Sequence, residues 1–99
     1  MTYTLIDGRK MNATHPETFE IPSMREVLKI KPGDFVKIGF TTPGASDNIR
    51  CERMWVKVTG LRTGILANDP VFTPMKHGDV VEYQDRNILD IMAPGKQKA

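Results

Sequence analysis

Between Glu52 and Thr59, the apolar residues Met54, Val56 and Val58 occupy every second position, and this is the clearest pattern in the chain. Side chains of an extended strand point to opposite faces in turn, so the pattern predicts a half-buried β-strand. The buried face of that strand is predicted to carry Met54, Val56 and Val58. The other face carries Arg53, Trp55, Lys57 and Thr59.

Shorter apolar runs bounded by Gly, Pro, Asn or Asp predict the other strands. They are Phe35 to Phe40, half-buried; Ile65 to Ala67, with Val71 and Phe72 as an extension beyond a bulge; Val80 to Tyr83; and Ile88 to Met92, where a strand is favoured over a helical turn. Residues 3–6 form either an edge strand or a loose arm.

Ser23 and Glu26 have the spacing of a capping box, in which the two residues satisfy each other's backbone N–H groups. Met24, Val27 and Leu28 then recur at helical spacing, and Pro32 and Gly33 end the pattern. The sequence therefore predicts one short helix, docked with Phe19 and Ile21 over one end of a sheet. Residues 9–16 are predicted to be an irregular connection.

Two segments share the pattern Lys-x-Gly-Asp followed by an apolar strand: Lys31 to Asp34 and Lys76 to Asp79. We expect these turns to occupy related corners of one sheet. Residues 41–50 contain many turn-forming residues and are predicted to be the longest loop.

The predicted fold is mostly β, bordering on α+β: a small antiparallel SH3-like barrel or curled sheet of about five strands, with one short helix near residues 23–30. Residues 1–13 are assigned to an N-terminal arm or edge strand, residues 14–93 to a single globular domain, and residues 94–99 to a disordered tail.

The composition fits one globular domain, with 99 residues, 39% hydrophobic and 26% charged. The net charge of +2 is mild and its charges are interspersed, so nucleic acid binding is allowed but not implied. Cys51 has no second cysteine to pair with, which favours a reducing compartment. With neither a signal-peptide pattern nor a long apolar run, we expect a cytoplasmic monomer or small homo-oligomer without membrane contact.

Motifs for catalysis, metal binding or phosphate binding are absent from the sequence, so no catalytic, cofactor-binding or metal-binding residues are assigned. Cys51 and His77 are the only conceivable nucleophile and base. Catalysis would need them within hydrogen-bond reach, with a third group to orient the histidine, and Cys51 merely borders a loop beside Arg50. His15 is predicted to be a surface residue. The sequence thus favours a protein that is not an enzyme.

The candidate binding surface consists of an aromatic and cationic strand face with polar residues near its ends. An exposed Trp flanked by cations can stack on a base or receive a peptide side chain. The alternative is that Trp55 lies over Gly39 or beneath the helix and simply covers the sheet. Asn68 and Asp69 are first a turn that ends a strand, or else part of a small polar pocket with Glu52 or Arg53. The whole candidate set is Arg53, Trp55, Lys57, Lys37, Glu52, Asn68 and Asp69.

Five short motifs occur in an order that resembles the bacterial proteins grouped as domain of unknown function 2314. They are PETF with IPS at residues 16–23, Leu28 with KPGDFVK at 31–37, ERMWV at 52–56, GILANDP at 64–70 and GDVV at 78–81. The resemblance covers residues 16–91 and implies a bacterial source and a small protein without an assigned activity.

Two hypotheses about function follow from the residues. The first is a non-enzymatic module that binds a protein partner through the Trp55 face or the loop of residues 41–50. The second is a nucleic-acid-binding small barrel that uses Lys37, Arg53, Trp55, Lys57 and Arg62. An enzyme with an unrecognised site is a third.

Overall fold

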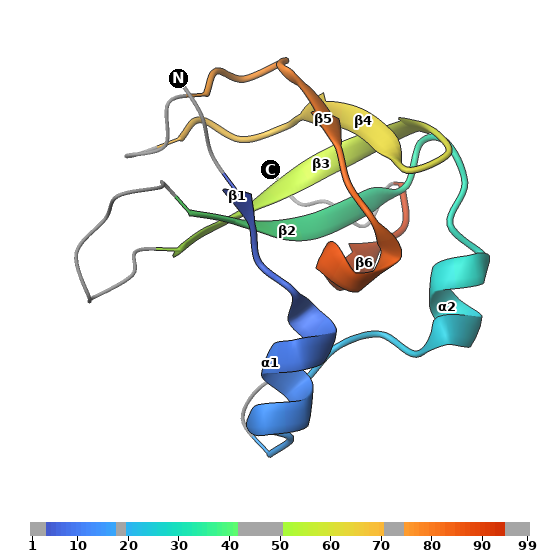
Figure 1. Cartoon of the computed structure of the whole chain (residues 1–99). Coiled ribbons are helices and arrows are strands. Elements are labelled where there is room, and N and C mark those ends of the chain that lie inside the picture. Colours follow the sequence, from blue (N-terminus) through green and yellow to red (C-terminus); the bar gives the residue numbers. More distant parts are fainter. Residues whose placement is uncertain (1–3, 18–19, 42–50, 71–74, 95–99) are drawn as a thin grey trace.

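The computed structural model describes residues 4–17, 20–41, 51–70 and 75–94. Within these ranges the chain forms six strands, two short α-helices and one turn of 3-10 helix (Figure 1). In chain order they are β1 (Thr4–Leu5), α1 (Gly8–Thr14), α2 (Met24–Leu28), β2 (Phe35–Thr41), β3 (Cys51–Gly60), β4 (Thr63–Leu66), β5 (Val80–Glu82), η1 (Asp85–Asn87) and β6 (Ile88–Met92).

The six strands form one antiparallel sheet in the order β1-β2-β3-β4-β5, with β6 also paired to β2. β1 pairs with the end of β2 and β6 with its beginning, so both lie along the same edge of β2. The sheet curls into a half-barrel, with α1 and α2 at one end (Figure 1). The predicted mostly-β fold with a curled antiparallel sheet is confirmed, with one strand and one α-helix more than expected.

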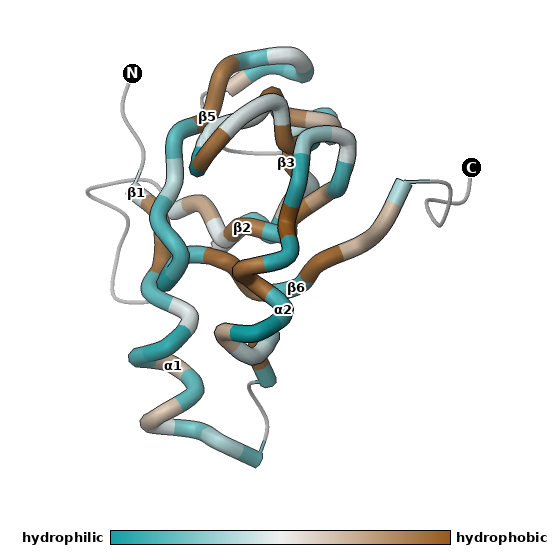
Figure 2. The backbone as a smooth tube through the Cα atoms, turned by 90° about the vertical axis from the view of Figure 1, so that its right-hand side faces the viewer, coloured by the Kyte–Doolittle hydropathy of each residue, from teal (hydrophilic) through white to brown (hydrophobic). Residues whose placement is uncertain are grey.

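The core lies on the concave side of the sheet, where β2 and β3 supply the inward side chains predicted from their alternation. Val36, Ile38, Phe40 and Val56 are fully buried. Figure 2 shows hydrophobic segments along the strands, whereas α1 is mostly hydrophilic. β2 is more buried than predicted, because it has a neighbour on each edge and Phe35 is only 8% exposed on the opposite face.

The two Lys-x-Gly-Asp segments form the same turn. Gly33 and Gly78 have φ angles of 100° and 96°, which favour glycine. In each turn the Asp carboxylate accepts the backbone N–H of the Lys three residues earlier, at 3.1 Å for Asp34 and 2.8 Å for Asp79. The expected equivalence of the two corners is therefore confirmed at the level of individual hydrogen bonds.

Each of these turns is also bonded to a neighbouring strand in the same way. The N–H of Gly33 donates to Val58 and the N–H of Gly78 donates to Leu66, both at 2.8 Å. In return, Val58 and Leu66 donate to the carbonyls of the two Asp residues at 2.8 Å. The turns thus align the start of β2 with β3 and the start of β5 with β4.

Helix α2 begins with the predicted capping box. Ser23 Oγ accepts the N–H of Glu26 at 3.2 Å, and the Glu26 carboxylate accepts the N–H of Ser23 at 2.9 Å. Only Val27 of the predicted apolar stripe is buried, whereas Leu28 is 77% exposed. The helix therefore docks through one side chain rather than through three.

The prediction of an irregular connection over residues 9–16 was wrong for most of that stretch, because α1 occupies residues 8–14. Asp7 caps this helix: its carboxylate accepts the N–H of Lys10 at 3.0 Å. Gly8 packs so closely that a Cβ there would lie 2.7 Å from Cδ2 of Leu89. The Asp-Gly pair, interpreted as a turn signal, is the start of a helix.

Strand β1 and the turn η1 are tied together by Asn87. Its side-chain amide donates to the carbonyl of Ile6 at 2.8 Å, and its Oδ1 accepts the N–H of Gln84 at 2.8 Å. Of the predicted arm at residues 3–6, Thr4 and Leu5 form the edge strand. The strand predicted at residues 88–92 is confirmed as β6.

Several predictions lie outside the described residues. They are the packing of Phe19, the extension through Val71 and Phe72, all but the first residue of the loop at residues 41–50, and the tail beyond Pro94.

Gly64 in β4 is predicted to be the glycine least able to accept a side chain. A Cβ there would lie 2.3 Å from the backbone oxygen of Lys57 and 2.7 Å from Cγ1 of Val56. Because the backbone of a paired strand cannot shift at low energetic cost, Gly64→Ala should lower the free energy of unfolding by about 3 kcal/mol, measured by chemical denaturation. Gly60→Ala is the control: its Cβ meets only a Thr63 methyl at 3.2 Å, so a loss as large as that of Gly64→Ala would contradict the close approach.

Candidate functional site

The cationic side chains predicted to share one face do lie on the convex side of the sheet. The register pairs Lys37 with Trp55, Gly39 with Arg53 and Phe35 with Lys57. Arg53 and Lys57 are exposed, and Lys37 and Trp55 are half-buried. We call the four residues Lys37, Arg53, Trp55 and Lys57 the outer face.

The Nζ of Lys37 lies 4.8 Å from the centroid of the Trp55 ring, which is a cation–π contact. One face of the indole is therefore occupied by a cation. Apolar side chains border the outer face on β4 and β5, where Ile65 is 37% and Val80 is 68% exposed. The result is a surface with aromatic, aliphatic and cationic parts side by side.

Asn68 supports the outer face rather than forming a separate site. Its side-chain oxygen accepts the backbone N–H of Trp55, and the N–H of Ala67 donates to the carbonyl of Trp55 at 2.9 Å. These bonds extend the pairing of β3 with the segment after β4. Its interpretation as a strand-ending residue therefore fits the structure.

Glu52 and Asp69 do not join Trp55 in one concavity. Glu52 lies opposite Phe40 and alternates with Met54, which places it on the concave side of the sheet. Asp69 is highly exposed and pairs with His77, whose Nδ1 lies 3.3 Å from Asp69 Oδ1. The polar pocket that would join Asp69 to Glu52 is therefore not formed.

The other residues considered for catalysis or metal binding do not form a site in the described part of the chain. His15 is exposed, as predicted, and the side chain of Cys51 lies outside the described residues. Within the described ranges, no group of three or more His, Cys, Asp or Glu side chains is arranged to hold a metal ion. Among the helices that the structure describes, none is long and apolar enough to cross a membrane.

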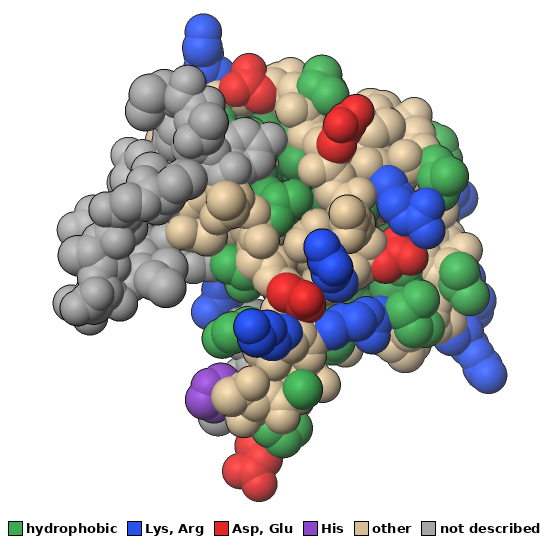
Figure 3. Space-filling view, viewed as in Figure 1, with side chains coloured by type: hydrophobic (Ala, Val, Ile, Leu, Met, Phe, Trp, Pro, Cys, Tyr) green, Lys and Arg blue, Asp and Glu red, His purple; other side chains and the backbone are tan. Residues whose placement is uncertain are grey.

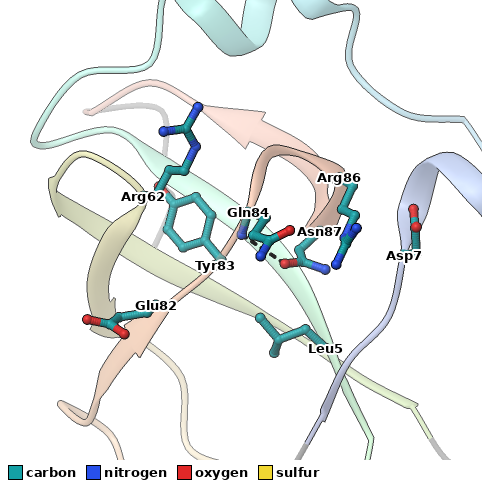
Figure 4. A pocket seen from close by; sticks show the side chains of 8 residues that line it. All are labelled: Leu5, Asp7, Arg62, Glu82, Tyr83, Gln84, Arg86 and Asn87. Carbon is teal, nitrogen blue, oxygen red and sulfur yellow. Dashed lines mark hydrogen bonds between the residues drawn. The ribbon is translucent and has the colours of Figure 1, made fainter.

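A cleft that the sequence did not predict opens between β1, β5, η1 and the turn joining β3 to β4 (Figure 4). Its volume is about 650 Å³. The lining side chains come from both ends of the chain and from its middle: Leu5, Asp7, Arg62, Glu82, Tyr83, Gln84, Arg86 and Asn87. Of these, only Arg62 belonged to a set of candidates named from the sequence.

Arg62 is held in place by both its backbone and its side chain. It is the one non-glycine residue in the described part of the chain with positive φ, at 57°. Its guanidinium donates two hydrogen bonds to Asp85, at 3.3 and 3.2 Å, and its carbonyl accepts the N–H of Tyr83 at 3.1 Å. A strained turn and a forked ion pair thus fix one wall of the cleft.

Tyr83 forms the floor of this cleft and is only 5% exposed. Burial, and secondly the negative charge of Asp85, raise the pKa of its hydroxyl, while Arg62 partly offsets the effect. The phenol therefore stays protonated throughout the neutral range.

A second open cleft of about 500 Å³ adjoins the first, because Arg62, Gln84 and Arg86 line both. Arg9, Met24 and Asp85 complete its lining. Figure 3 shows Lys and Arg side chains gathered with acidic ones on this face, above α1.

No family model, curated protein or solved structure matches the chain. The resemblance to the domain of unknown function 2314 therefore stays a prediction.

The raised pKa of Tyr83 gives a testable dependence of stability on pH. The folded state holds the phenol proton more tightly than the unfolded state, whose tyrosine pKa is about 10. The free energy of unfolding should therefore carry no contribution from this group below about pH 10, and should fall as the pH rises through the higher folded pKa.

Chemical denaturation between about pH 8 and 11.5 would compare the protein with Tyr83→Phe. The protein should lose more stability above about pH 10 than the variant does. Parallel losses in the two proteins would contradict the buried, protonated phenol.

Proposed function

We propose that this protein is a small non-enzymatic interaction module that binds an acidic segment of a partner protein on its outer face. We further propose that the protein is bacterial and cytoplasmic, that it belongs to the domain of unknown function 2314 group, and that its sheet is an SH3-like barrel. Two features support the barrel: the 3-10 turn η1 stands directly before the last strand, and that strand returns to pair with β2.

The single observation that carries the proposal is the Lys37–Trp55 contact on a rigid, paired part of the sheet. Strand-borne side chains are held in fixed positions, so binding would require little ordering of the site. Trp combines a large contact area with few rotatable bonds and is enriched among residues that dominate interfaces. The outer face is thus built to offer an aromatic anchor beside cations.

Charge indicates the kind of partner. Lys37, Arg53 and Lys57 supply three positive charges within the seven-residue pairing of β2 with β3, and the register brings one carboxylate, Asp90, opposite Lys37. Exposed Ile65 and Val80 add apolar surface next to them. A segment with Asp or Glu residues around an apolar side chain complements this arrangement.

A nucleic-acid strand is the second candidate, supported by the same cations. Stacking of a base requires a free ring face, and Lys37 already covers one face of Trp55. An acidic peptide can keep this contact and bind the Lys37 ammonium directly, so the geometry favours the protein partner.

Binding can be measured through Trp55 itself, because it is the only Trp in the chain. We expect a synthetic peptide with Asp and Glu flanking a Leu to change its emission saturably, and the same peptide with Asn and Gln to bind at least about tenfold more weakly. Lys37→Glu should weaken binding of the acidic peptide by about tenfold or more.

The control variant is Lys29→Glu, which makes the same charge change at the exposed end of α2. It should leave the affinity within about twofold, since exposed charges beyond a Debye length are screened. Equal losses of peptide affinity in Lys37→Glu and Lys29→Glu would show that binding depends on the net charge of the protein and not on the outer face, and would contradict the proposed site. Tight binding of single-stranded DNA with a steep salt dependence, without peptide binding, would favour the second candidate.

A further inference from the structure

Three arginines from separate parts of the chain converge on the two adjoining clefts. Arg9 comes from α1, Arg62 from the turn between β3 and β4, and Arg86 from η1. We call the site formed by Arg9, Arg62, Arg86 and Gln84 the arginine cleft. It is lined by none of the outer-face residues.

The positive charges of the second cleft exceed the carboxylates that line it. In the second cleft three guanidinium groups meet one carboxylate, Asp85, which is bonded to Arg62. Arg9 donates instead to the neutral sulfur of Met24. Within the described residues, neither Arg9 nor Arg86 is at ion-pair distance from a carboxylate.

The two carboxylates of the first cleft, Asp7 and Glu82, bring the two clefts together to three arginines and three carboxylates, so the excess of positive charge belongs to the second cleft alone. Asp7 keeps its charge but also accepts the N–H of Lys10 at the start of α1, at 3.0 Å. Glu82 lies at the opposite end of the cleft from Arg86 and points away from it (Figure 4). An anion between Arg9 and Arg86 would therefore meet mainly donors.

The walls of the cleft are fixed before any ligand binds. Arg62 is held by Asp85, and Asn87 bonds both Gln84 and the segment after β1.

From this geometry we infer that the arginine cleft binds phosphate groups. Guanidinium is a planar fork that donates two parallel hydrogen bonds to a phosphate, and the amide of Gln84 adds donors of the same kind. The two clefts, of about 650 and 500 Å³, are large enough for a ligand with more than one phosphate. A free polyphosphate compound and a nucleic-acid backbone share this chemistry.

The experiment titrates the full chain with two probes at low salt. Inorganic pyrophosphate is followed by the NMR shifts of backbone amides, and a fluorescein-labelled single-stranded oligonucleotide by anisotropy. We expect saturable shifts at residues 84–87 with pyrophosphate, a saturable rise in anisotropy with the oligonucleotide, or both. Preference for pyrophosphate would identify a small phosphorylated compound, and preference for the oligonucleotide, with a steep salt slope, a nucleic-acid backbone.

Substitutions that remove charge without adding bulk then test the residues. Arg9→Gln together with Arg86→Gln should weaken binding of the preferred probe by about tenfold or more. Lys29→Gln removes one exposed positive charge that lines neither cleft, and at about 0.15 M salt, where the Debye length is about 8 Å, it should change affinity less than about twofold. Thermal denaturation confirms that each variant is folded.

Two results would overturn the inference. One is the absence of shifts with millimolar pyrophosphate together with no oligonucleotide binding at low salt. The other is equal weakening by Lys29→Gln and by the double arginine variant. Trp55 lines neither cleft, so Trp55→Ala should lose peptide binding and keep phosphate binding. Failure of the outer-face proposal alone would show as no peptide binding by the unaltered protein with phosphate binding intact.

Discussion

The pairing of β2 with β3 is the interaction on which the rest of the structure depends. Seven residue pairs, from Phe35↔Lys57 to Thr41↔Cys51, fix which side chains of both strands face the core. A slip of one residue would send Val36, Ile38 and Phe40 to the convex side and expose the core. β1 and β6 add to the free edge of β2 and β4 adds to β3, so every other strand takes its place from this pair.

The same register creates the outer face. Because side chains alternate, the positions that bury Val56 and Met54 necessarily place Trp55 and Arg53 on the convex side. Lys37 then lies opposite Trp55, which is the geometry that their cation–π contact requires. The proposed binding surface is thus a direct consequence of the pairing that forms the core.

Local features of the fold were predictable because their causes are local. Alternation identified β3, the capping box identified α2, and the repeated Lys-x-Gly-Asp pattern identified two equivalent turns. Helix α1 was missed because its polar residues show no apolar period and its Asp7-Gly8 start is also a turn signal. Asp7 resolves this ambiguity only through its bond to Lys10.

The arginine cleft could not have been predicted, because its residues lie far apart along the chain. Arg9, Arg62 and Arg86 come together only when η1 leads β6 back to β2 and Asn87 ties η1 to the N-terminal segment. By contrast, the outer-face residues lie on two strands whose alternation was visible. Glu52 and Asp69 were assigned to that surface by proximity in sequence, and the pairing placed them elsewhere.

We propose that the protein has two separate binding surfaces of different chemistry. The decisive measurement is an NMR map of backbone amide shifts, recorded once with the acidic peptide and once with pyrophosphate. We expect peptide-induced shifts at residues 37 and 53–57 and pyrophosphate-induced shifts at residues 84–87. Shifts from both ligands at one common set of residues would contradict it.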